Sequence, residues 1–429
     1  MLLNFSDREL FELLSVLCVL LAGSYALYLI GRRLERSRQG LLLVAPMFAA
    51  FGLRLGAAVG LNQLSIAQDL RGGDELTFLG QAGEIAALPL TGSDSLDTLT
   101  SELHTFIFSL HYRTFDLTPP DLMLRVEMIV LAVLGIALLS AAVYELAGPR
   151  AALIAAWILA LEPASIFFSS LLHKEPIMYL AEGMVAFGGA VLWKRGNLAA
   201  LFPIVAGCLI AIATRPYVGW FLTAAAAAVV LHASLTRQRG LRSFALTSTC
   251  LILVFAFVPV VWAESSNEKL EQLQGSQNAN AADDSNLALE QVDYSTRRKL
   301  IINLPERIGD VILRPYLWQT ENPSQQLGAL GTVVVLACLA LLAVAIARNR
   351  RAIMPLAAPL VYPALFMLVA YSISAGNAGT AYRYRTHLVS LALCLIVVLL
   401  ARRKQEQEAP ARVRARPGFD PVSRTRIVT

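Results

Sequence analysis

Charged residues are scarce in this chain: they make up 16% of its 429 residues, whereas a soluble protein carries about 25%. The mean hydropathy is +0.58. These values exclude the series of soluble domains that the length alone would suggest, and they indicate that lipid or neighbouring helices surround most of the chain. The net charge of +5 does not indicate nucleic-acid binding, because the basic residues cluster in short loops between apolar runs.

Several other signals are missing. The five cysteines are far apart and each lies inside an apolar segment, which excludes a disulfide framework and a metal-ligand spacing; they are Cys18, Cys208, Cys250, Cys338 and Cys394. The chain lacks a Rossmann-like nucleotide-binding domain. It also lacks a basic region before its first apolar run, so we expect that run to be kept as a membrane span and not cleaved as a signal peptide.

Eleven apolar runs dominate the sequence. A helix needs about 20 apolar residues to cross the hydrocarbon core of a membrane, and eleven runs reach or approach that length. They are 9–30, 41–60, 122–146, 151–170, 175–193, 198–214, 217–234, 243–263, 328–347, 353–373 and 387–401. The sequence therefore predicts an all-α polytopic membrane protein with about eleven transmembrane helices.

The connections between the runs differ in charge, and every second one is basic. Basic connections lie on the cytoplasmic side of a membrane, which predicts an outer N-terminus and a cytoplasmic C-terminus in the cytoplasmic (inner) membrane. We divide the chain into an extra N-terminal span with a basic cytoplasmic loop (1–40), a transmembrane core (41–401) and a basic cytoplasmic tail (402–429). We expect the tail to be disordered.

Two long loops lie on the opposite, extracytoplasmic side, at 60–121 and 264–327. In the first loop, apolar residues spaced by three and four predict two short helices at the membrane surface, from Leu76 to Leu88 and from Leu96 to Leu110. In the second, the polar stretch 274–285 is expected to be disordered. A further interfacial helix is expected at 301–312. Binding and catalytic residues concentrate on such loops.

The first candidate site is the acidic stretch QDLRGGDELTF, which contains Asp69, Asp74 and Glu75. A carboxylate held close to a hydroxyl group can take its proton as a general base. A structural role explains the same pattern, because Asp74 could cap a helix and Glu75 would favour the positive end of that helix.

The second candidate is the turn His173-Lys174-Glu175 in SSLLHKEPIMYL. Lys174 could bind a phosphate as a point charge, with His173 and Glu175 in supporting roles. The alternative is a solvated turn in which Glu175 and Pro176 open the next helix.

The third candidate is a set of arginines. Arg383 and Arg385, in AYRYRTHLVSLAL, lie on the outer side, where basic residues are less expected, and guanidinium groups match phosphate geometry. Snorkelling to the membrane surface is the alternative. Arg215, in ATRPYVGW, is a further outward cation or a plain span boundary. Arg54 lies inside an apolar run, where it needs a partner; we expect an acid of the first loop, such as Asp69.

These cations suit a phosphate carried on a lipid, and the acids suit proton abstraction. Glycosyl transfer from a polyprenyl-phosphate sugar needs both, because cations stabilise the departing phosphate and a carboxylate activates the acceptor hydroxyl. Such a donor also requires no nucleotide-binding domain.

Four passages resemble the GT-C superfamily of integral membrane glycosyltransferases, most of all the branch with protein O-mannosyltransferases and the bacterial aminoarabinose transferase of lipid A. They are GLRLGAAVG with GGDELTFLGQA, IFFSSLLHKEPIMYLA, ATRPYVGWFL and AYRYRTHLVSLAL, in the family's order. Departures are Phe78 where the family often has Tyr, a missing proline after the last passage, the extra span 9–30 and no soluble C-terminal domain.

The resemblance implies roles for individual residues. Asp74 would be the catalytic base with Glu75 beside it, and Lys174, Arg383 and Arg385 would hold the donor phosphate, with Arg215 as a further phosphate contact. Some members of the family use a divalent cation; we expect none at Asp74 and Glu75, and no other cofactor.

The sequence leaves three functions open. The first is transfer of a sugar from a polyprenyl-phosphate donor to an envelope glycan, lipid or protein. The second is an envelope polysaccharide polymerase or ligase that uses lipid-diphosphate-linked glycans. The third is a transporter or flippase, which would place ionisable residues near the bilayer midplane and break helices in pairs. The candidate charges lie at one membrane surface, which favours the transferase.

Overall fold

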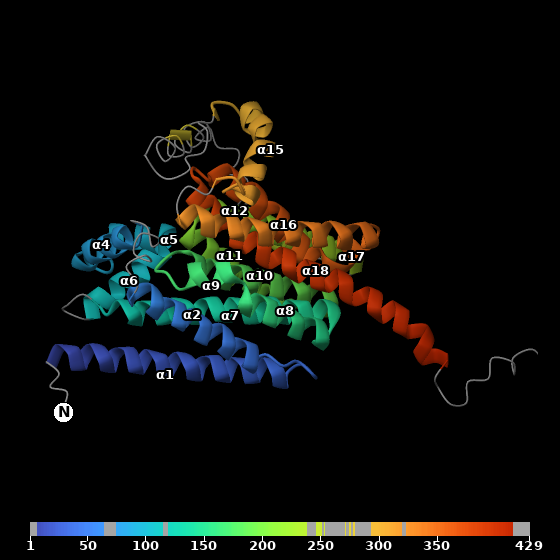
Figure 1. Cartoon of the computed structure of the whole chain (residues 1–429), viewed down its shortest axis with the longest axis horizontal. Coiled ribbons are helices and arrows are strands. Elements are labelled where there is room, and N and C mark those ends of the chain that lie inside the picture. The colour runs from blue at the N-terminus through green and yellow to red at the C-terminus, as the bar shows by residue number, and fades with distance from the viewer. Residues whose placement is uncertain are drawn as a thin grey trace, which may run out of the picture.

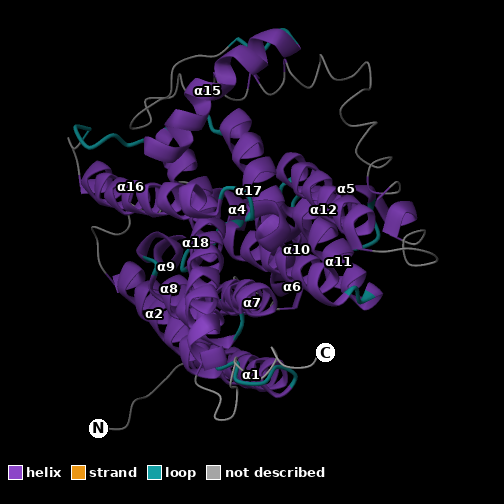
Figure 2. Cartoon of the chain, turned by 90° about the vertical axis from the view of Figure 1, so that its right-hand side faces the viewer, coloured by secondary structure: helices purple, strands orange, loops and turns teal. Residues whose placement is uncertain are grey.

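The computed structural model describes residues 7–63, 74–114, 119–237, 246–250, 293–319 and 323–414, together with a few single positions between 251 and 292. Within these residues the regular structure is helical throughout (Figures 1 and 2). The first half contains α1 (Asp7–Arg36), α2 (Val44–Gln63), α4 (Asp74–Ala87), α5 (Ser93–Ser101), α6 (Leu103–Thr114), α7 (Asp121–Ala147), α8 (Pro149–Leu161), α9 (Pro163–Ser169) and α10 (Glu175–Arg195). The second half contains α11 (Leu201–Thr214), α12 (Pro216–Arg237), α15 (Arg297–Leu313), α16 (Pro323–Asn349), α17 (Ile353–Ser374) and α18 (Ala378–Arg414).

Eight of these helices are long and apolar enough to cross a membrane, or nine if the bent pair α8 and α9 forms one span. The eight are α1, α2, α7, α10, α12, α16, α17 and α18. The predicted class of an all-helical polytopic membrane protein is therefore confirmed. The count of eleven stays a prediction, because the run 198–214 forms a shorter helix and most of 243–263 lies outside the described residues.

The predicted span 151–170 is broken, with a bend of 60° between α8 and α9. Pro163 has no N–H group to donate to the carbonyl of Leu159, and the Glu162 carboxylate accepts hydrogen bonds from the backbone N–H groups of Ala164 and Ser165. The chain therefore starts a new helix where the sequence predicted a continuous one. Pro163 and the capping Glu162 are the local cause.

Arg54 finds hydrogen-bond partners at this break. The guanidinium of Arg54 donates to Ser165 Oγ and Ser169 Oγ, both at 2.8 Å, and to the carbonyls of Leu159 and Ala160 at 3.5 and 3.3 Å. These carbonyls lose their helical partners at the break, so the side chain supplies the missing donors. Asp69, the partner that the sequence suggested, lies outside the described residues.

Two helices, α7 and α10, form the centre of the bundle and pack with backbones in close approach. A Cβ atom on Gly183 of α10 would lie 2.6 Å from the carbonyl oxygen of Gly135 of α7. Small residues allow such approach between membrane helices. Figure 2, viewed along the long axis, shows these two helices and α18 inside, with α1 and α16 at the edge.

The helices α4, α5 and α6 gather at one end of the bundle, called the loop end below (Figure 1). The predicted helix at Leu76–Leu88 is confirmed as α4. The second predicted helix, Leu96–Leu110, is two helices, α5 and α6, which meet at Glu102, where the backbone leaves the helical region with φ −140° and ψ 56°. The predicted helix at 301–312 is confirmed as α15.

The tail differs from its prediction. Helix α18 continues to Arg414, so disorder from 402 onward is wrong for 402–414. The segment is rich in Ala, Arg, Gln and Glu, which are strong helix formers. The stretch 274–285, also predicted as disordered, lies outside the described residues except for three single positions.

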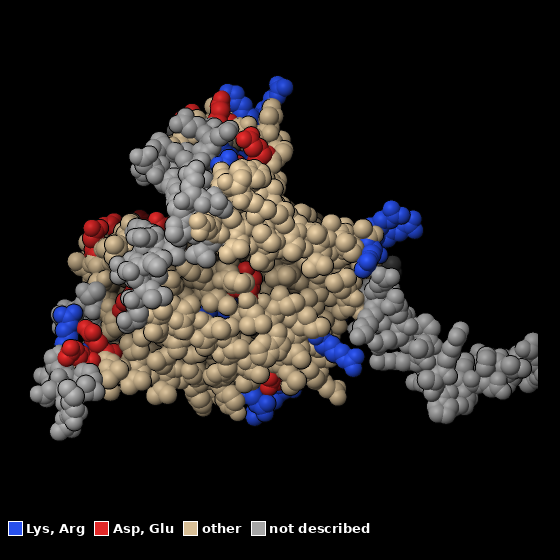
Figure 3. Space-filling view, viewed as in Figure 1, with Lys and Arg blue, Asp and Glu red and all other residues tan. Residues whose placement is uncertain are grey.

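The surface agrees with membrane burial. Figure 3 shows a broad band with few charged residues, and blue and red side chains gather mainly at its two ends and over α15 at the top. Lipid tails can cover such a band without desolvating charges.

The contact between α7 and α10 gives a test of the packing. We expect Gly183→Ala to lower the melting temperature of the purified protein in detergent, because an added methyl group in a packed core costs about 1–3 kcal/mol. The control is Gly52→Ala in α2, where a Cβ atom has no neighbour within 4 Å. Equal melting temperatures for the two variants would contradict the close backbone approach.

Candidate functional site

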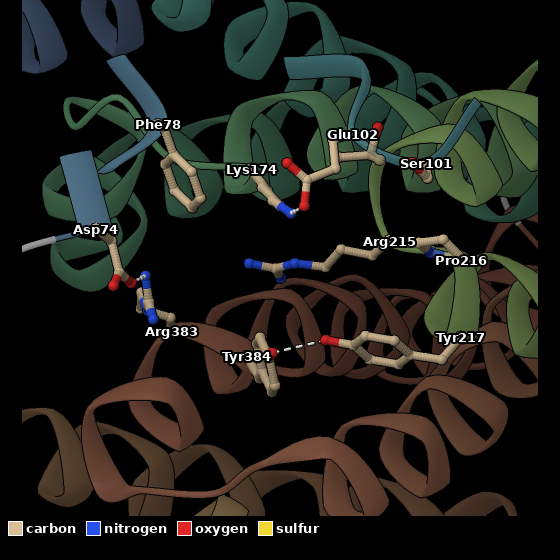
Figure 4. Close-up of a pocket in the computed structure, with 11 residues that line it drawn as sticks. Asp74, Phe78, Ser101, Glu102, Lys174, Arg215, Pro216, Tyr217, Arg383 and Tyr384 are labelled. Carbon is tan, nitrogen blue, oxygen red and sulfur yellow. Dashed lines mark hydrogen bonds and ion pairs between the residues drawn. The ribbon is translucent and has the colours of Figure 1, made fainter. Parts of the chain in front are cut away.

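A pocket of about 370 Å³ opens at the loop end and collects side chains from distant parts of the chain. It lies between α4, the junction of α5 and α6, the turn before α10, the junction of α11 and α12, and the start of α18 (Figure 4). Its lining residues are Asp74, Phe78, Ser101, Glu102, Lys174, Thr214, Arg215, Pro216, Tyr217, Arg383 and Tyr384. Four of the ten residues predicted as site residues from the sequence therefore line one pocket.

Arg215 is the most buried cation of the pocket, with 6% of its side chain exposed, and it points into the open space (Figure 4). Its Nη2 donates to Glu175 Oε1 at 2.6 Å, and its guanidinium stacks 4.7 Å from the ring centre of Tyr384. Its Nη1 has no hydrogen-bond partner within the described residues. A buried N–H donor without a partner is costly, so this atom is ready to bind an anion.

Local sequence holds Arg215 in this place. Helix α11 ends at Thr214, Arg215 has the non-helical angles φ −144° and ψ 87°, and Pro216 opens α12, a position that proline favours. The hydroxyls of Tyr217 and Tyr384 lie 2.7 Å apart and connect α12 to α18. The Arg-Pro turn therefore lines the pocket and does not only mark the boundary of a span.

Two ion pairs occupy the rest of the pocket. Arg383 Nη1 lies 2.6 Å from Asp74 Oδ2, and Lys174 Nζ lies 3.5 Å from Glu102 Oε1. The acids remain accessible, with 49% of the Asp74 side chain and 38% of the Glu102 side chain exposed. The lining thus carries three cations and two acids, which favours an anionic ligand.

Burial lowers the pKa of both His173 and Lys174. Burial and the neighbouring Arg383 guanidinium lower the pKa of His173 to about 4. A neutral imidazole can therefore accept a hydrogen bond from Arg383 Nη1, which lies 3.3 Å from His173 Nδ1. Burial also lowers the pKa of Lys174 below its usual range, against the opposing effect of Glu102. The pocket therefore holds its cations at a cost that a bound anion would remove.

Glu75, predicted as catalytic, lies outside the pocket lining. Its carboxylate is 2% exposed and makes a two-pronged pair with Arg125, at 2.8 and 3.1 Å. It also accepts a hydrogen bond from the backbone N–H of Leu172 at 2.7 Å. These contacts tie α4 to α7 and to the turn that carries Lys174, so the structure gives Glu75 a supporting position.

Arg385, predicted to bind phosphate, also lies outside the lining. Its Nη1 donates to the carbonyls of Ile312 and Arg314 and to Thr332 Oγ1, at 3.0 to 3.1 Å. Arg383 lines the pocket and Arg385 does not, because residues two positions apart on a helix face different sides of it. His173 and Glu175 stand behind the pocket, against Arg383 and Arg215.

Sequence reasoning missed Glu102, Tyr217 and Tyr384 as lining residues. No motif marks Glu102, because only the break between α5 and α6 brings it to the pocket. It also missed ionisable residues inside the spans: Glu182 of α10 and His387 of α18 are fully buried, with Nδ1 and Oε2 3.1 Å apart. A charged residue in an apolar run was the available signal.

Among the described residues, no group of three or more His, Cys, Asp and Glu side chains could hold a metal ion. Comparisons with known proteins found no match: no protein-family model, no curated protein and no solved structure matches the chain.

The position of Glu75 can be tested by stability. We expect Arg125→Met and Glu75→Gln to lower the melting temperature strongly, because breaking a buried ion pair costs about 3–5 kcal/mol. The control is Arg8→Met, whose pair with Glu12 is exposed. A Glu75→Gln variant with an unchanged melting temperature and no activity would instead give Glu75 the chemical role that the family resemblance implies.

Proposed function

We propose that this protein is a membrane glycosyltransferase that transfers a sugar from a polyprenyl-phosphate donor to a cell-envelope acceptor. The observation that carries the proposal is Arg215, a nearly buried guanidinium that points into a pocket with one nitrogen unpartnered in the described chain. Lys174 and Arg383 line the same space. Three converging cations in a half-enclosed pocket suit a phosphate better than a carboxylate of single charge.

The position of the pocket supports a lipid carrier. It lies at the loop end of an apolar helical bundle, where the headgroup of a membrane lipid would sit. A polyprenyl chain could then remain in the bilayer while its phosphate reaches the cations. The basic connections predicted from the sequence put this end on the extracytoplasmic side of the inner membrane, with the acceptor arriving from the envelope for glycan or polysaccharide synthesis.

The chemistry follows from the charges. The acceptor oxygen attacks the anomeric carbon, the bond from that carbon to the phosphate oxygen breaks, and the electron pair leaves with the phosphate. Lys174, Arg215 and Arg383 stabilise the negative charge that develops there. A carboxylate at the pocket takes the acceptor proton; the resemblance to GT-C enzymes gives this role to Asp74, which faces the pocket from the first turn of α4.

A transporter or flippase of the same lipid is a second candidate, and one observation favours it. The span formed by α8 and α9 is broken, and Glu182 pairs with His387 inside the membrane part of the bundle, features that transporters use. Flux of a labelled lipid across proteoliposomes without any glycosyl product would favour this candidate.

Phosphate binding tests the pocket directly. We expect farnesyl phosphate, a short polyprenyl monophosphate, to bind the purified protein in nanodiscs and to bind the Arg215→Gln variant about 10–100 times more weakly, because a charge-assisted hydrogen bond is lost. Since this variant leaves Glu175 buried without its partner, the double variant with Glu175→Gln checks that folding is not the cause. Arg150→Gln, an exposed arginine on α8, is the matched control. Equal affinities for all variants would refute the phosphate site.

The lowered pKa of Lys174 predicts a pH dependence. Lys174 is charged below its pKa and neutral above it, so the affinity for farnesyl phosphate should fall as the pH rises through a value below that of an ordinary lysine. Ionisation of the phosphate, near pH 6, acts in the opposite direction. In Lys174→Arg the cation keeps its charge, and the fall in affinity should disappear. The same fall in both proteins would show that Lys174 is not its source.

A further inference from the structure

Glu102 is the acid of the pocket that neither the motifs nor the family resemblance marks. It ends α5 and immediately precedes the first residue of α6, Leu103. This place puts Glu102 at the N-terminal end of a 12-residue helix, where a negative charge interacts favourably with the helix dipole. Its side chain lines the pocket opposite Asp74, beyond Lys174 (Figure 4).

Two side chains of α6, Thr105 and His104, hold Glu102 through a chain of hydrogen bonds. Thr105 Oγ1 donates to Glu102 Oε2 at 3.3 Å, and His104 Nε2 lies 3.1 Å from the same hydroxyl. Burial holds the pKa of His104 well below its ordinary value, so the imidazole is neutral. Because the one proton of the Thr105 hydroxyl goes to Glu102, we assign the ring proton to Nε2, which then donates to that hydroxyl. Both links donate toward Glu102, which fixes Oε2 as an acceptor and leaves Oε1 toward the pocket.

The two acids of the pocket are held differently. Asp74 contacts Arg383 at 2.6 Å, and an arginine in a protein does not lose its charge. Glu102 contacts Lys174 at 3.5 Å, a distance at which the hydrogen bond is weak. Glu102 is therefore the carboxylate that an incoming anion displaces more easily from its cation.

We propose that Glu102 is the general base of the reaction and that the donor phosphate releases it for this role, an inference that rests on the proposed function. In the free protein Glu102 is the counter-ion of Lys174. When a phosphate binds Lys174 and Arg215, the lysine exchanges one anion for another, and Oε1 of Glu102 is freed beside the reacting groups. Asp74 then acts as a positioning residue that holds Arg383.

The step balances in atoms and charge. The acceptor oxygen forms a bond to the anomeric carbon while the carbon–oxygen bond to the phosphate breaks, and the phosphate leaves with that electron pair. The proton of the acceptor hydroxyl passes to Oε1 of Glu102. Because the base is released only when the phosphate is in place, Glu102 stays the counter-ion of Lys174 until the donor binds.

Turnover and binding together test this assignment. The donors are farnesyl-phosphate-linked hexoses and pentoses, with an extract of cell-envelope lipids and glycans as acceptor, and the measured quantities are product formation and the affinity for farnesyl phosphate. We expect Glu102→Gln to lose at least about 100-fold in kcat, the usual contribution of a general base. Its affinity for farnesyl phosphate should stay equal or become tighter, because a competing negative charge is gone.

Two variants complete the comparison. Asp74→Asn should keep kcat within about tenfold and mainly raise KM, as expected when a positioning contact to a phosphate-binding arginine is weakened. Glu84→Gln, an exposed acid of the same loop region on α4, should behave like the unaltered protein. Tight binding of farnesyl phosphate by Glu102→Gln would also show that this variant is folded.

The outcomes separate the two proposals. If Glu102→Gln turns over within tenfold of the unaltered protein, or if Asp74→Asn loses kcat as strongly as Glu102→Gln, the assignment of the base to Glu102 is overturned while the transferase stands. If no donor yields product and farnesyl phosphate binds independently of Arg215, the proposed function itself fails.

Discussion

The site depends on the buried ion pair between Arg215 and Glu175. Glu175 opens α10, and Arg215 joins α11 to α12, so their contact at 2.6 Å fixes the relative position of three helices. The pair satisfies one nitrogen of the guanidinium, and the other has no hydrogen-bond partner among the described residues. This buried charge is stabilised chiefly by Glu175 and by the face of Tyr384, and a bound anion would stabilise it further.

Other buried arginines in the bundle are also held by hydrogen bonds to neighbouring elements. Arg54, Arg125 and Arg385 are each almost fully buried, and each makes several hydrogen bonds that join elements far apart in sequence. Arg125 connects α7 to Glu75 and to the turn before α10, whereas Arg385 connects α18 to the chain end of α15. These three arginines therefore connect helices of the bundle, whereas Lys174, Arg215 and Arg383 line the pocket.

The sequence was a good guide to features that depend on local pattern. Apolar run length predicted most of the spans, and the spacing of Leu and Ile predicted α4 and α15, because both signals report which face a helix buries. Residues that line the pocket were predictable where a charge interrupts an apolar context, as with Lys174, Arg215 and Arg383.

Features that depend on tertiary geometry were not predictable. Glu75 and Asp74 are neighbours in sequence and both acidic, yet one packs on Arg125 and the other reaches the pocket, because successive residues of a helix point about 100° apart. Arg383 and Arg385 separate for the same reason. Glu102 enters the pocket only because the helix breaks beside it, and the Glu162-Pro163 break was masked by the apolar residues on either side.

The break between α8 and α9 has a consequence for how the chain enters a membrane. Arg54 of α2 finds its hydrogen-bond partners on residues 159–169, which are synthesised about a hundred residues later. A lone α2 in lipid would hold an uncompensated guanidinium in hydrocarbon, and a lone α8–α9 segment would hold bare carbonyls. Each segment thus supplies the hydrogen-bonding groups that the other lacks, so the second span reaches its full stability only after the fourth has been synthesised and has packed against it.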